Sequence, residues 1–115
     1  MVRIVSVETR DLSFRLAPGE GTDAVHDSSK YGYSVVIVHT TSDDPAVAAP
    51  TGFGIAFTLG AGESVIGSLA KALAEPLIGQ EISDVFKELG KWQNRISNHP
   101  QWRWVGPHKG VVSLA

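Results

Sequence analysis

The sequence contains no cysteine, which excludes disulfide bonds and metal sites built from thiolates. It has no apolar run near the roughly 20 residues that a membrane-spanning helix needs, and its N-terminus lacks the long apolar core of a signal peptide. It also has little excess charge, and a net charge of -2 gives no general electrostatic reason to bind nucleic acid or an anionic membrane. We therefore expect a cytoplasmic protein whose partners include neither nucleic acid nor membrane.

The chain has the size and composition of one folded domain. A chain of 115 residues buries roughly two thirds of its unfolded surface, which is enough for one modest core. A hydrophobic content of 43% and a charged content of 19% are typical of a globular protein. No internal repeat or low-complexity segment is present.

Three stretches in the first half of the chain have the pattern of β-strands. Residues 2–16 alternate apolar and polar side chains, with a kink expected near Asp11. Residues 33–41 are rich in β-branched side chains, and residues 52–59 form the third strand after a hairpin-like connection over 42–50.

The polar segment 17–32 lies between the first two strands. At about sixteen residues it exceeds the usual connection length in compact domains, which indicates a functional or a disordered loop. It carries His26 together with Asp23, Asp27 and Tyr31. Because these residues share so long a loop, two interpretations fit them about equally well: a ligand-binding group, and loop residues exposed to solvent.

The second half of the chain has a helical pattern. Apolar side chains at three- and four-residue spacing predict one helix over 66–77, before Gly79, and a second over 82–96. The predicted fold is α+β, a three-stranded antiparallel meander followed by a helical bundle. We expect both helices to cover one face of the sheet.

The sequence shows binding groups but no reaction centre. It has no Gly-x-Ser-x-Gly elbow and no cysteine nucleophile, and its four histidines lack metal-ligand spacing. We expect His39 to be a partly exposed strand residue with a polar partner. The glycines of segment 60–62 are better explained by a tight strand-to-helix turn than by phosphate binding, because Glu63 would place a carboxylate where the phosphate would sit. The acidic residues Glu81, Asp84 and Glu88 suit the start of the second helix.

The region after residue 101 combines aromatic and basic side chains. Trp102, Arg103 and Trp104 have the composition of a stacking platform for nucleic acid, but the overall charge argues against that function. The alternative is that the two tryptophans attach this segment to the helices of the domain.

Three motifs, in this order and spacing, resemble the N-terminal region of L-fuconate dehydratases, which are acid-sugar dehydratases of the enolase superfamily. They are Asp-Ala-Val-His at 23–26, Gly-x-Gly-Ile-x-Phe-Thr-Leu-Gly at 52–60, and Arg-Trp-Val-Gly-Pro-x-Lys-Gly-Val-Val at 103–112. The resemblance runs over nearly the whole chain, and the last motif is its most specific part.

The resemblance implies a two-domain protein of which this chain is the first part. Residues 1–109 correspond to an α+β capping domain with a specificity loop at 17–32, and residues 110–115 to the start of the segment that leads into a (β/α)8 barrel. In the family the barrel supplies the Mg ligands, a lysine base and a histidine. The resemblance therefore implies a hydro-lyase that binds Mg, with no catalytic or metal-binding residue in this chain, which would be inactive alone.

The resemblance also implies a set of substrate contacts. By position, Gly21, Thr22, Asp23 and Tyr31 match contacts of the mobile loop to an acid sugar; weaker matches are His26, the pair Phe57 and Thr58, and Trp104. The expected partners are the acid-sugar substrate, the barrel domain and further copies in a homo-oligomer.

The sequence departs from the family pattern at three positions. His108 stands where glutamate is expected, Ser113 where histidine is expected, and Thr22 replaces a small apolar residue. These departures leave open which sugar acid is used. Two alternatives stay open as well: the capping domain of another enolase-superfamily dehydratase or racemase, and a free-standing binding module.

Overall fold

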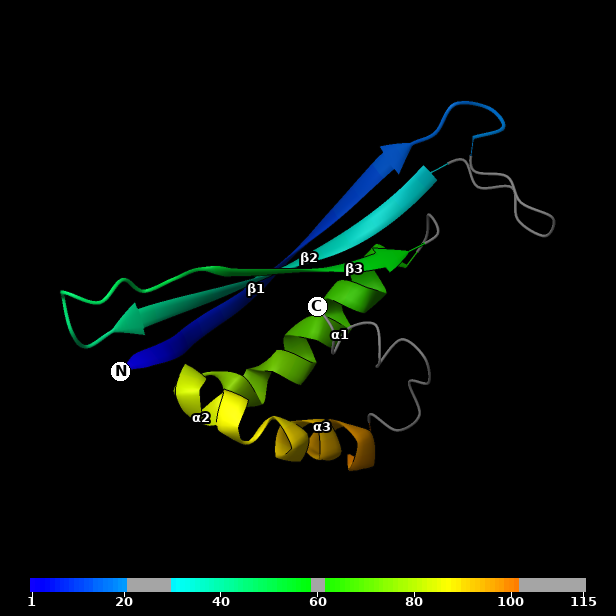
Figure 1. Ribbon diagram of the computed structural model, residues 1–115. Helices are drawn as coiled ribbons and strands as arrows, with labels where there is room; N and C mark the ends of the chain where they lie inside the picture. The colour runs from blue at the N-terminus through cyan, green and yellow to red at the C-terminus, as the bar shows by residue number, and fades with distance from the viewer. Residues whose placement is uncertain (21–29, 59–61, 102–115) are drawn as a thin grey trace.

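A computed structural model of the chain describes residues 1–20, 30–58 and 62–101. It contains a three-stranded antiparallel sheet followed by helices, which confirms the predicted α+β meander (Figure 1). The sheet has the order β1-β2-β3, with β1 (Val2–Arg15), β2 (Lys30–Ser42) and β3 (Gly52–Thr58). The helical elements are α1 (Glu63–Ala74), the 3-10 turn η1 (Glu75–Leu77), α2 (Ile82–Lys87) and α3 (Leu89–Asn98).

The strand register gives the sheet two different faces. Ser34 and Val36 of β2 are buried, as is Ala56 of β3 opposite Ser34, and Val36 and Ala56 belong to a core cluster with side chains of α1. We call this side the helix face. Because side chains alternate along a strand, the intervening residues of β2 and β3 lie on the opposite side, which we call the open face. Its exposed large apolar side chains on β3 are Phe53, Ile55 and Phe57.

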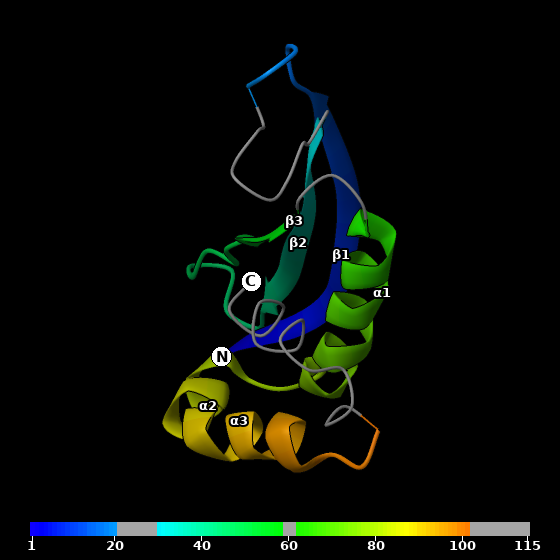
Figure 2. The ribbon, with the colours of Figure 1, turned by 90° about the vertical axis from the view of Figure 1, so that its right-hand side faces the viewer.

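Helix α1 provides most of the helical part of the core. Its buried apolar side chains recur at three- and four-residue spacing and pack on β1 and β2; they are Ile66, Leu69, Ala70 and Leu73. Figure 2 shows α1 running beside the sheet next to β1. At Gly67 the helix comes so close to the sheet that an added Cβ would lie 2.6 Å from Asp11 Oδ1 and 2.8 Å from Ser34 Oγ.

We expect Gly67→Ala to destabilise the domain. The new methyl group must displace the carboxylate of Asp11, which accepts a hydrogen bond from Ser34 Oγ at 3.1 Å, and this overpacking costs more than the gain in helix propensity. The net loss should be about 1 kcal/mol in urea unfolding. Gly90→Ala in α3 is the matched control, because an added Cβ there would meet nothing within 4 Å; it should stabilise by about 0.5–1 kcal/mol. Equal effects of the two changes would contradict the close packing at Gly67.

Two details of the strands differ from the sequence prediction. The predicted loop 17–32 is too long at its second end, because Lys30, Tyr31 and Gly32 pair with β1 as the start of β2. The irregularity of β1 lies between Ile4 and Ser6, where the register with β2 shifts, and the continuous pairing at Asp11 shows that the predicted kink there is wrong.

The second predicted helix is not continuous. Glu88 has φ -107° and ψ 23°, outside the helical region, and it separates α2 from α3. The following Gly90 has a low helix propensity, so the break falls at a weak point of the pattern. Only α1 runs along the sheet: α2 and α3 lie near the C-terminal end of α1 (Figure 1), so the expectation that both predicted helices cover the sheet is wrong. No helix within the described ranges is long and apolar enough to cross a membrane.

Candidate functional site

The candidate site residues that the structure describes gather where β1 ends, β2 begins and β3 ends. We call this region the loop end of the sheet. Tyr31 and Gly32 start β2, Phe57 and Thr58 finish β3, and Glu63 begins α1 just beyond it. The meander itself causes this convergence, because the β1–β2 connection and the β3–α1 connection leave the same end of an antiparallel sheet.

Four aromatic rings form one cluster on the open face at the loop end. The ring of Tyr31 lies edge-on to Phe57, with centroids 5.4 Å apart, and Tyr33 lies 5.5 Å from the same ring. Phe14 of β1 makes an edge contact with Tyr33 at 5.7 Å. The predicted substrate contacts Tyr31 and Phe57 are therefore neighbours, held by ring contacts on two strands. The hydroxyl groups of Tyr31 and Tyr33 give this apolar cluster two donors or acceptors.

Thr58 lies on the other face of the sheet. Its register partner is Gly32, and strand alternation turns it toward α1 while Phe57 faces the open side. Thr58 Oγ1 and Glu63 Oε1 are buried and have no hydrogen-bond partner in the part of the chain that the structure describes. The Glu63 carboxylate lies against Gly32, in space that any larger residue at 32 would need. Phe57 and Thr58, which were predicted as a pair, thus lie on opposite faces of the sheet. Phe57 makes aromatic contacts, and the hydroxyl group of Thr58 is buried.

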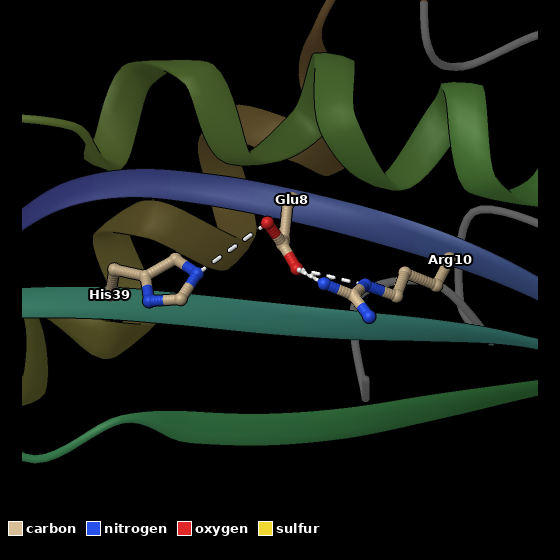
Figure 3. A network of polar contacts seen from close by, with 3 residues as sticks. All are labelled: Glu8, Arg10 and His39. Atoms are coloured by element: carbon tan, nitrogen blue, oxygen red, sulfur yellow. Dashed lines mark hydrogen bonds and ion pairs between the residues drawn. The ribbon is translucent and has the colours of Figure 1, made fainter.

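The open face also carries a small polar network, which is drawn in Figure 3. Glu8 Oε1 of β1 accepts a hydrogen bond from Arg10 Nε at 3.0 Å, and Arg10 Nη2 lies 3.0 Å from the same oxygen. His39 Nε2 of β2 lies 3.7 Å from Glu8 Oε2, which confirms the prediction of a partly exposed strand histidine with a polar partner. All three side chains are exposed to solvent by 41% or more, so the network contributes little to stability.

A groove of about 300 Å³ lies at the other end of the domain, between α1 and the following helices. Its lining is largely apolar, with Leu73, Leu77, Val85, Leu89, Trp92 and Ile96. The groove adjoins the C-terminal end of α1, whereas the loop end adjoins the N-terminal end of that helix. It therefore lies on a different part of the surface from Tyr31, Phe57 and Thr58, the predicted substrate contacts that the structure describes.

Most of the predicted substrate contacts lie outside the described residues: Gly21, Thr22, Asp23, His26 and Trp104. Of the four strongest candidates, only Tyr31 is described, and it is a strand residue rather than a loop residue. Within 1–20, 30–58 and 62–101, no group of three or more histidine, aspartate or glutamate side chains is placed to hold a metal ion. The arrangement at the loop end can bind and orient hydroxyl groups, and the described residues provide no metal site for chemistry.

The sequence relatives of the chain include mitochondrial enolase superfamily member 1 and L-galactonate dehydratase. The chain is 33% identical over 114 residues to mitochondrial enolase superfamily member 1 of Homo sapiens, covering 98% of this chain and 25% of that protein. It is 31% identical over 115 residues to L-galactonate dehydratase of Hypocrea jecorina, covering 99% of this chain and 24% of the relative. No protein-family model matches the chain. The chain thus spans about a quarter of the length of these relatives.

Two solved structures have the same fold over most of the chain. Human mitochondrial enolase superfamily member 1 superposes with a TM-score of 0.76 and 32% identity over 96% of this chain and 24% of the other. L-talarate dehydratase from Polaromonas sp., solved with Mg and L-glucarate, superposes with a TM-score of 0.59 and 21% identity over 80% of this chain. The second likeness supports the fold alone.

Proposed function

Because the chain belongs to the enolase superfamily and corresponds to its N-terminal region, we propose that it is the substrate-capping and specificity domain of a magnesium-dependent acid-sugar dehydratase. The observation that carries the proposal is the match of 99% of this chain to about a quarter of L-galactonate dehydratase. The reaction is removal of a proton next to the carboxylate followed by loss of water, which yields a 2-keto-3-deoxy acid. L-Fuconate is the proposed substrate, because the sequence motifs resemble those of L-fuconate dehydratases.

The metal belongs to another part of the proposed enzyme. The described residues offer no set of ligands for Mg, so no step of the reaction is assigned to a metal held here. Mg bound by a barrel domain, beyond residues 110–115, would supply positive charge next to the substrate carboxylate. The role of this chain is to bind the distal hydroxyl groups of the sugar and to exclude water from the reacting carbon.

The proposed contacts follow from the hydrogen-bonding needs of a polyol. Asp23 has a carboxylate that can accept hydrogen bonds from two hydroxyl groups, while the backbone of Gly21 and the hydroxyl of Thr22 add further polar groups. The ring of Tyr31 packs against the ring of Phe57 at the loop end. Together the two rings offer the sugar a rigid apolar surface, which supports this role. His26 and Trp104 complete the proposed set. A site that hydrogen-bonds hydroxyl groups rejects sugars that lack them, because its own polar groups are then left unpaired.

The reading frame that follows the codon of Ala115 tests the proposal. We expect it to continue into a barrel domain with a lysine, three carboxylate metal ligands and a histidine. A stop codon directly after Ala115 would instead support a free-standing binding module. Conversion of a library of acid sugars by the complete protein would separate the dehydratase from a racemase, because a racemase releases no 2-keto-3-deoxy product.

A further inference from the structure

The outer edge of β1 is open along most of its length. β1 has 14 residues and pairs on one side with β2. On its outer side, Arg3 forms a bridge with Glu81, and Ile4 exchanges backbone hydrogen bonds with residues 79–80. From Ser6 to Arg15, no described element pairs with this edge. Such an edge offers unpaired backbone donors and acceptors to another strand.

The charges on this edge are arranged symmetrically about one residue. Glu8 and Arg10 flank Thr9, lie on the open face and are both exposed. In an antiparallel pair of identical strands, the residue before the twofold axis lies opposite the residue after it in the other strand. With the axis at Thr9, Glu8 of each strand therefore lies opposite Arg10 of the other strand.

We propose that β1 pairs with β1 of a second copy of this chain, antiparallel about a twofold axis at Thr9. Residues 6–12 of the two strands form the interface and join the two sheets into one of six strands. Glu8 lies opposite the partner's Arg10, and the intrachain contact between Glu8 and Arg10 joins all four side chains into a ring of alternating charge. The inference is independent of the proposed function.

The same charges select this register over its neighbours. Moving the axis to residue 8 sets glutamate opposite glutamate, and moving it to residue 10 sets arginine opposite arginine. Like charges directly opposite each other destabilise a strand pair. Pairing further toward the N-terminus is blocked at Arg3 and Ile4, whose outer edges are occupied by residues 79–81.

The helix face has room and charge for the same arrangement. A groove of about 410 Å³ adjoins β1 on this side, lined by Val7, Ser68, Lys71, Ala72, Glu75 and Ile78. In the proposed register, Val7 lies opposite the partner's Asp11. Lys71 lines this groove, and we expect its ammonium group to face that carboxylate, whose Oδ1 also accepts a hydrogen bond from Ser34 Oγ of its own chain at 3.1 Å.

The test is a charge-reversal series on the 115-residue chain, with the dimer dissociation constant measured by sedimentation equilibrium. The wild type should be a dimer, and E8R and R10E should each raise the dissociation constant at least about tenfold, because each sets like charges opposite twice. An equimolar mixture of E8R and R10E should associate again, since every opposed pair becomes complementary. The double variant E8R/R10E should also dimerise as the wild type does.

Controls separate this interface from a general charge effect. K71E should weaken the dimer through the partner's Asp11, while K87E, on the exposed part of α2, should leave it unchanged. Circular dichroism on each variant checks that it is folded. A wild-type chain that stays monomeric at its highest soluble concentration would overturn the proposal, and so would a dimer that neither reversal weakens or a mixture that fails to associate.

Discussion

Leu69→Ala is expected to lower the free energy of unfolding by about 2–5 kcal/mol, the largest effect of any single change considered for this domain. Leu69 is 7% exposed and lies on the buried stripe of α1, where it packs in one cluster with Val36 and Ala56 of the sheet. Its truncation removes apolar contacts and leaves a cavity between the helix and the sheet. The core has only nine buried apolar residues in the described part of the chain, so few neighbours can move to fill the space.

Val65→Ala is the matched control for this prediction. Val65 lies on the same helix but is 66% exposed, so its truncation should change the stability by no more than about 0.5 kcal/mol. Urea unfolding followed by the helical circular dichroism signal measures both variants. A loss below about 1 kcal/mol for Leu69→Ala would show that α1 does not hold the sheet as the structure has it.

Asp23→Ala is expected to lower kcat/KM of the complete protein by about 5- to 150-fold on the acid sugar that it converts, which corresponds to about 1–3 kcal/mol of transition-state binding. In the proposed function, the carboxylate of Asp23 accepts hydrogen bonds from hydroxyl groups of the substrate. Its removal leaves those hydroxyl groups buried without partners. The effect should be smaller on a sugar acid that lacks the distal hydroxyl groups, because that substrate does not use Asp23.

Asp43→Ala controls for the loss of a negative charge. Asp43 is exposed and follows β2 at the end of the sheet opposite the loop end, so its removal should leave kcat/KM unchanged. Steady-state kinetics on both variants, with the product measured as a 2-keto-3-deoxy acid, gives the comparison. Unchanged kinetics of Asp23→Ala on every accepted sugar acid would remove Asp23 from the proposed site.

The order of the elements could be predicted from the sequence, because each of the three strands and α1 has a clear apolar period. The ends of the elements were harder to predict. Lys30 and Gly32 have weak strand propensity, yet pairing with Arg15 and Ser13 of β1 makes them part of β2. The sequence does not predict the helix break at Glu88, because the apolar pattern continues through this position. The backbone nevertheless leaves the helical conformation there.

The candidate site could be predicted only in part. Motif resemblance pointed to Tyr31 and Phe57, which the structure places in ring contact, but it gave no reason to include Phe14 and Tyr33. Their membership depends on the register of three strands, and no single strand carries that information. The buried pair of unpartnered atoms on Thr58 and Glu63, within the described part of the chain, depends in the same way on how α1 meets β3. A signal for Glu63 did exist in its position in the sequence, just after the glycines of segment 60–62.

The most direct test of the proposed function is an acid-sugar dehydration assay on the complete protein encoded by this reading frame, with and without Mg. We expect that at least one acid sugar, with L-fuconate the first to test, is converted to its 2-keto-3-deoxy acid, and that removal of Mg by EDTA abolishes the conversion. A complete protein that carries the barrel residues and dehydrates none of the sugar acids in the presence of Mg would contradict the proposed function.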